Sequence, residues 1–121
     1  MGTSVDAATP FAVSNILADE FVPFLEDGQE LGLVHWLREE DVSAGEVVTG
    51  IWRADPGTPA CDFEYHFTAN ETFDVLEGSV HIVLSDGQSV DVGPGDIAAV
   101  RKGTLSHWTV KAPFRKFFVI S

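Results

Sequence analysis

Residues 64–107 carry the strongest structural signal in this chain, and they read EYHFTANETFDVLEGSVHIVLSDGQSVDVGPGDIAAVRKGTLSH. Glu64 and His66 stand two residues apart, so both side chains point the same way if the backbone is an extended strand. Glu71 lies across a short predicted bend, and His107 can come from a distant strand of the same sheet. Two imidazoles and two carboxylates form a mixed nitrogen and oxygen set that suits a divalent first-row metal. We therefore predict a metal site made of Glu64, His66, Glu71 and His107.

Short segments rich in β-branched and aromatic residues recur from Gly32 onward, and glycine, proline and aspartate separate them. This pattern predicts many short strands joined by tight turns, which is typical of an all-β sandwich or barrel. Residues 1–30 are predicted to be a lead, flexible over 1–10, with a short helical turn within 14–27 that ends at Pro23. Residues 31–121 are predicted to form one barrel domain. The predicted strands are 33–38, 46–54, 62–67, 73–76, 80–84, 89–92, 97–101, 106–111 and 116–120.

The composition limits the class of protein. A chain of 121 residues with 45% hydrophobic content suits one folded domain. Its net charge of −12 argues against nucleic acid or an anionic membrane as a partner, because both attract basic surfaces. Cys61 is the single cysteine, which excludes an intramolecular disulfide and favours a reducing compartment. The chain shows neither a signal-peptide pattern nor an apolar run of membrane-spanning length, so we expect a cytoplasmic protein.

The orientation of two predicted strands stays open at this level. In the strand at 62–67, Phe63 and Tyr65 occupy one face while Glu64 and His66 occupy the other. Either face can line a barrel, so the pair is either a set of ligands or a polar outer surface. A register shift of one residue decides in the same way whether Ser106 or His107 faces inward. Glu71, taken alone, is equally well explained as a cap on the turn that follows Asn70.

The motifs resemble the cupin superfamily. Gly57, Glu64-Tyr65-His66, Glu71 and Gly78 follow its first motif with Glu64 in place of a histidine, and Gly95-Asp96 with Gly103 follow its second. The fragments of residues 47–120 are similar in order and spacing to the ureidoglycine aminohydrolase-type cupin family. The fragments that carry this likeness are Gly50-Ile51-Trp52, Pro56-Gly57, Asn70-Glu71-Thr72, Leu76-Glu77-Gly78, Lys102-Gly103, Trp108-Thr109-Val110 and Arg115-Lys116.

This resemblance implies a jelly-roll barrel, often dimeric, with its site inside. It implies a divalent metal, manganese first and iron or zinc as alternatives, held by a Glu-x-His pair, a histidine and a glutamine. Glu64 and His66 match that pair, whereas Glu71 and His107 stand at the other two positions with changed residue types. Characterised aminohydrolases of this type have two cupin domains, and this chain has length for one.

Other residues are predicted to support the site. Lys116 is a weak catalytic candidate, as a proton carrier or a contact for a substrate carboxylate. The predicted cavity lining is Tyr65, Phe73, His81 and Trp108, although His81 also suits a structural role.

Three functions fit the sequence. The first is a metal-dependent enzyme, aminohydrolase-like, that acts on a small polar, ureido or amino-acid-derived metabolite. The second is a non-catalytic barrel that binds or senses a small ligand without a working metal site. The third is a structural homodimer whose aromatic strand faces form the interface. A complete ligand set inside the barrel would favour the enzyme, and a mainly apolar pocket would favour the binding protein.

Overall fold

The computed structural model describes residues 12–39 and 45–121, which form an all-β jelly-roll barrel of a single domain, as predicted. The predicted flexible lead at 1–10 lies outside the described residues. No helix in the described ranges is long and apolar enough to cross a membrane. The elements are β1 Val22–Glu26, β2 Gln29–Arg38, β3 Val48–Ala54, a short 3-10 helix Pro59–Cys61, β4 Asp62–His66, β5 Glu71–Leu84, β6 Ser89–Val92, β7 Ile97–Val100 and β8 Leu105–Ile120.

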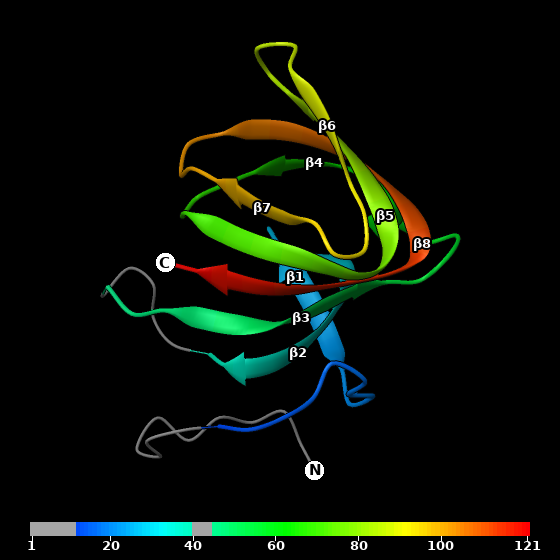
Figure 1. Cartoon of the computed structure of the whole chain (residues 1–121), viewed down its shortest axis with the longest axis vertical. Coiled ribbons are helices and arrows are strands. Elements are labelled where there is room, and N and C mark those ends of the chain that lie inside the picture. The colour runs from blue at the N-terminus through cyan, green and yellow to red at the C-terminus, as the bar shows by residue number, and fades with distance from the viewer. Residues whose placement is uncertain (1–11, 40–44) are drawn as a thin grey trace.

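Two long bent strands, β5 and β8, pair antiparallel along most of their length and form the side of the barrel (Figure 1). The second half of β8 also pairs with β3, and its first half pairs with β4. β7 pairs with the start of β5 and β6 with its end, while β2 and β1 extend the sheet beyond β3. The two long strands therefore belong to both walls of the barrel, and their inward side chains line one interior.

β5 and β8 correct the prediction of separate short strands at 73–76 and 80–84 and at 106–111 and 116–120. The predicted turn at Glu77-Gly78 is an irregularity within β5, and the predicted break at Ala112-Pro113 is a bend within β8. Gly78 has φ +75°, and a Cβ there would lie 2.4 Å from the carbonyl oxygen of Pro113. Turn-forming residues thus mark bulges that bend a continuous strand around the barrel.

The N-terminal segment differs from its prediction. Val22–Glu26 is strand β1, paired with β2, so the helical turn predicted within 14–27 is wrong over these residues. The chain reaches Pro23 in extended backbone, and its register shifts between Pro23 and Leu25. Proline at a bulged edge strand costs no ladder hydrogen bond, so Pro23 is compatible with a strand there.

The core is rich in aromatic residues. Trp108 is 1% exposed, and its ring stacks on Phe63 with centroids 5.5 Å apart and packs against Phe73 at 5.4 Å. Trp52 packs edge-on against Trp108 and Phe114. These rings fill one end of the interior, so the polar groups near them lie in an apolar environment.

Candidate functional site

Alternation along β5 and β8 places one acid and one base inside the barrel. In β8, Phe114, Lys116 and Phe118 are all buried, which makes their common face the inner one. Glu71, the first residue of β5, faces the same interior together with Phe73 and Val75. Glu71 and Lys116 form the one fully buried ion pair among the described residues, and their side chains are 3% and 8% exposed.

The ammonium group of Lys116 donates a hydrogen bond to Oε2 of Glu71. Its Nζ also lies 4.6 Å from the ring centroid of Phe73 and 4.7 Å from that of Trp108. The rings of Trp52 and Phe118 are within 5.7 Å. Aromatic faces attract a cation, so these rings and the carboxylate together hold the lysine in one position.

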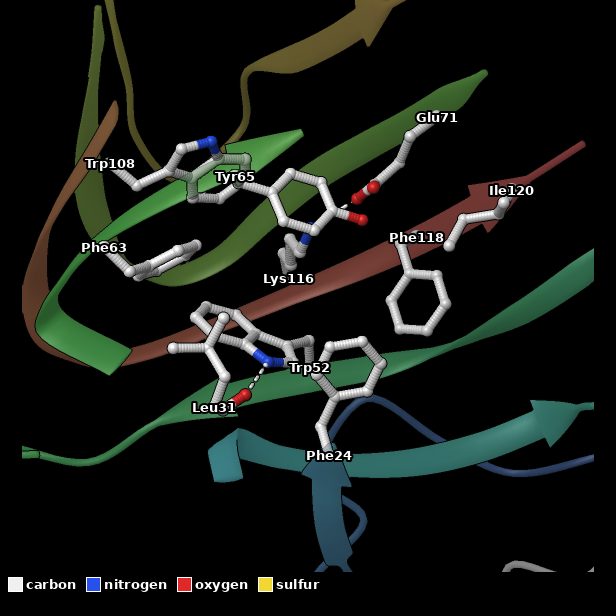
Figure 2. Close-up of a pocket in the computed structure, with 10 residues that line it drawn as sticks. All are labelled: Phe24, Leu31, Trp52, Phe63, Tyr65, Glu71, Trp108, Lys116, Phe118 and Ile120. Carbon is white, nitrogen blue, oxygen red and sulfur yellow. Dashed lines mark hydrogen bonds and ion pairs between the residues drawn. The ribbon is translucent and has the colours of Figure 1, made fainter. Parts of the chain in front are cut away.

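A pocket opens onto this pair between the two walls of the barrel (Figure 2). The cavity has a volume of about 30 Å³, which is room for about two waters or a ligand of a few heavy atoms. Its surface is mainly apolar, with the acid–base pair as the charged exception. The residues that line it are Phe24, Leu31, Trp52, Phe63, Tyr65, Glu71, Trp108, Lys116, Phe118 and Ile120.

Tyr65 adds a phenol to the pocket wall, and Figure 2 shows its ring close to Glu71 and Lys116. Burial raises the pKa of the Tyr65 hydroxyl, and the negative charges of Glu71 and Glu26 raise it further. The phenol is therefore neutral across the physiological range and can donate a hydrogen bond. The pKa of Glu26 is itself raised, mainly by burial and then by the charge of Asp27.

The four predicted metal ligands do not converge. In β4, Phe63 and Tyr65 line the interior, so Glu64 and His66 point outward and are exposed. In β8, Ser106 and Trp108 are buried and His107 faces outward with Glu64. Glu71 alone lies inside. The aromatic face of β4 was a better candidate for burial than the face with Glu64 and His66, because burying two or three rings removes far more apolar surface from water than burying those two polar side chains.

Two of these outward-facing residues, Glu64 and His107, form a surface cluster with Asp62. His107 Nδ1 lies 2.7 Å from Oε2 of Glu64, and His107 Nε2 lies 2.5 Å from Oδ1 of Asp62. The hydrogen bond to Glu64 and then the one to Asp62 raise the pKa of His107. Both imidazole nitrogens are used in these contacts, and no group of three or more histidine, cysteine or acidic side chains among the described residues has a geometry that could hold a metal. The residues present therefore do not fit the metal centre that the resemblance implies.

The predicted cavity lining is placed in part. Tyr65 and Trp108 line the pocket, and Phe73 is buried directly beside the Lys116 ammonium. His81 lies on the outer face, where its Nδ1 is 2.8 Å from Oδ1 of Asp91, which corrects its placement in the cavity. Val80 and Ile82 are both 2% exposed, and strand alternation sends the residue between them outward.

Sequence reasoning named Glu71 and Lys116 without pairing them. The alternation of Phe114, Lys116 and Phe118 was the available signal for an inward lysine. A lysine between two buried aromatics needs a counter-charge, and Glu71 is the acid on the inner face of β5, the strand that pairs with β8. Phe24 and Leu31 of the pocket were missed, because the strands that carry them lie in and next to the segment predicted as a lead.

Comparison with known proteins gives one family match and several similar structures. Residues 43–118 match the family described as the EutQ-like cupin domain. A DUF861 family protein of Thermotoga maritima is 31% identical, over 56% of this chain and 73% of its own, with a TM-score of 0.50. No match was found among curated proteins.

Two further solved structures share the fold. The EutQ protein of Clostridium difficile is 19% identical over 79% of this chain and 73% of its own, with a TM-score of 0.57. A putative ethanolamine utilization protein Q of Salmonella typhimurium is 23% identical over 83% of this chain and 76% of its own, with a TM-score of 0.58. These matches support the cupin part of the resemblance and do not extend to its ureidoglycine aminohydrolase branch.

Proposed function

The chain belongs to the family of EutQ-like cupin domains, and on that premise we propose that its barrel binds a small, uncharged, polar metabolite. One observation carries the proposal, namely the buried Glu71–Lys116 pair at the wall of an otherwise aromatic pocket. The proposal corresponds to the second of the three functions that fit the sequence, a binding or sensing barrel.

The charge state of the pocket favours a neutral ligand. Glu71 and Lys116 already compensate each other, and both are almost fully removed from water. An anion that approached Lys116 would meet the carboxylate of Glu71, and a cation that approached Glu71 would meet the ammonium. Either ligand would add an unpaired charge to an apolar cavity, which costs several kcal/mol.

The pair offers one hydrogen-bond donor and one acceptor side by side. A ligand carbonyl accepts from the Lys116 ammonium, while an adjacent N–H donates to the Glu71 carboxylate. Amide and ureido groups carry these two functions on neighbouring atoms. Their planar bodies also suit the faces of Trp52 and Trp108. We therefore infer that a small amide or ureido compound is the class of ligand.

Metal-dependent aminohydrolase chemistry is not part of this proposal. It would need several ligands around one point inside the barrel, and Glu64, His66 and His107 lie on the outer surface. The pocket's own acid–base pair, together with the neutral phenol of Tyr65, supplies every polar contact that the binding proposal requires.

Saturation-transfer NMR tests the proposal with N-methylurea, acetamide, acetate and methylammonium as probes. We expect transfer to the two neutral probes, and much weaker transfer to the two ions. Glu71→Gln and Lys116→Met should abolish the signal, whereas Glu64→Gln on the outer face should leave it unchanged. Equal transfer to all four probes, or full transfer in Lys116→Met, would overturn the proposal.

A further inference from the structure

We propose that Lys116 is also a carbonyl-capturing group, whose Nζ condenses with a small aldehyde in the pocket to give an iminium ion and water. This second activity uses the same pocket as the proposed binding function but does not depend on the amide or ureido ligand. Three observations carry it: the burial of the lysine, the carboxylate bonded to its nitrogen, and the small cavity in front of it.

The first requirement is an amine that can lose its proton. Only the neutral amine attacks a carbonyl carbon, and in water a lysine side chain is almost entirely protonated. Here the Lys116 ammonium is hydrogen-bonded to Oε2 of Glu71, so a base is already in place. Proton transfer along this bond gives a neutral amine and a carboxylic acid.

The reaction then balances with the groups present. The lone pair of Nζ forms a bond to the aldehyde carbon, and the carbonyl oxygen takes the proton from Glu71 to give a carbinolamine. Glu71 next receives a second proton from the nitrogen and passes it to the hydroxyl group. The hydroxyl leaves as water while the nitrogen lone pair forms the C=N bond. Two protons of the original ammonium leave in the water, and the positive charge stays on the nitrogen as an iminium ion.

The surroundings suit the product as well as they suit the resting lysine. The iminium nitrogen carries the same charge at the same place, next to Glu71 and the rings of Phe73 and Trp108. No charge becomes unpaired during the reaction. The cavity of about 30 Å³ suits a compound of a few heavy atoms, such as a two-carbon or three-carbon aldehyde.

The other lysines provide an internal comparison. Lys102 and Lys111 are the remaining lysines of the chain, and both are exposed. Neither lies in the pocket. Ordinary surface chemistry favours these two, because the reagents reach them freely. A faster reaction at buried Lys116 would therefore be due to its surroundings in the pocket and not to its accessibility.

The experiment incubates the full chain with limiting acetaldehyde and sodium cyanoborohydride, which reduces an iminium ion to a stable N-ethyl amine. Peptide mapping by mass spectrometry then follows each lysine and the N-terminal amine separately over time. We expect Lys116 to react at least about ten times faster than Lys102 and Lys111, a modest part of what a positioned acid–base group contributes. A Lys102→Arg/Lys111→Arg variant should keep full trapping at Lys116.

Glu71→Gln tests the role of the carboxylate. We expect trapping at Lys116 to fall by about a hundredfold in this variant. If the substitution unfolds the chain, Lys116 becomes as exposed as Lys102 and the Lys116-to-Lys102 ratio becomes one, whereas loss of the base in a folded chain lowers the ratio well below one. A ratio at or below one in the folded wild-type protein, or an unchanged ratio in Glu71→Gln, would overturn the proposal.

The two proposals fail separately. Transfer to N-methylurea without trapping at Lys116 would leave the binding function standing and reject carbonyl capture. Trapping at Lys116 without transfer to any neutral amide probe would reject the proposed ligand class and leave capture standing.

Discussion

Lys116→Met removes the positive half of the buried ion pair and leaves a side chain of similar length. Glu71, 3% exposed, then stays in an aromatic cavity without its counter-charge. Removing one partner of such a pair costs about 3–5 kcal/mol of unfolding free energy, and the contacts of Nζ with the surrounding rings add to this loss. A domain of this size has roughly 5–15 kcal/mol in total, so we expect Tm to fall by about 10–20 °C.

Urea denaturation followed by tryptophan fluorescence measures the effect, with Lys111→Met as the exposed control. The double variant Glu71→Leu/Lys116→Met separates charge from packing, because an apolar pair of similar volume leaves no charge uncompensated. We expect the double variant to regain at least about 2 kcal/mol over Lys116→Met. A loss below about 1 kcal/mol in Lys116→Met, or a double variant no more stable than that single one, would refute the reasoning.

Four further outcomes are expected. NMR titration should give His107 a pKa above its ordinary value, because the hydrogen bond to Glu64 favours the imidazolium. The imidazolium then stabilises the folded state below the ordinary pKa of histidine, and this stabilisation is lost as the pH rises through the raised pKa. Glu64→Gln should lower the pKa of His107. Gly78→Ala should lower the free energy of unfolding by about 2 kcal/mol or more in urea denaturation, because its Cβ would lie 2.4 Å from the carbonyl oxygen of Pro113. The control Gly57→Ala should cost only about 1 kcal/mol, because Gly57 has φ +76° and nothing within 4 Å. Adding Mn²⁺ or a chelator should leave Tm unchanged, and a rise with Mn²⁺ would contradict the geometry of the site. The homodimer that the resemblance implies stays a prediction, and light scattering of the purified chain will give the mass that confirms or rejects it.

The sequence predicted the fold well because turn residues and strand alternation are local signals. Gly78 and Pro113 were recognised as residues that interrupt a regular strand, but residue type alone does not show whether the chain reverses in a turn there or only bends. That difference depends on close packing of β5 against β8, where the backbone at Gly78 meets the carbonyl oxygen of Pro113. Strand β1 was missed because Pro23 lies among its apolar residues and was interpreted as the end of a helical turn.

The site was predicted less well because a motif position does not fix which way a side chain points. Glu64 and His66 stand where the resemblance implies ligands, yet the aromatic residues beside them occupy the interior. Glu71 was placed inside for a different role, and Lys116 was noted only as a weak candidate. Their pairing joins residues 45 positions apart, and they meet because both face the interior of the barrel from the paired strands β5 and β8.

The most direct test of the central claim is a two-dimensional NMR titration of the indole N–H groups with N-methylurea. Trp52 and Trp108 line the pocket, and their Nε1 atoms donate to the Leu31 carbonyl and to Ser106 Oγ at 3.0 Å each. Binding beside Glu71 and Lys116 predicts saturable shifts of both indole signals, which acetate does not produce and which Lys116→Met abolishes. Unchanged signals, or shifts that persist in Lys116→Met, would contradict the assignment of this pocket as the binding site.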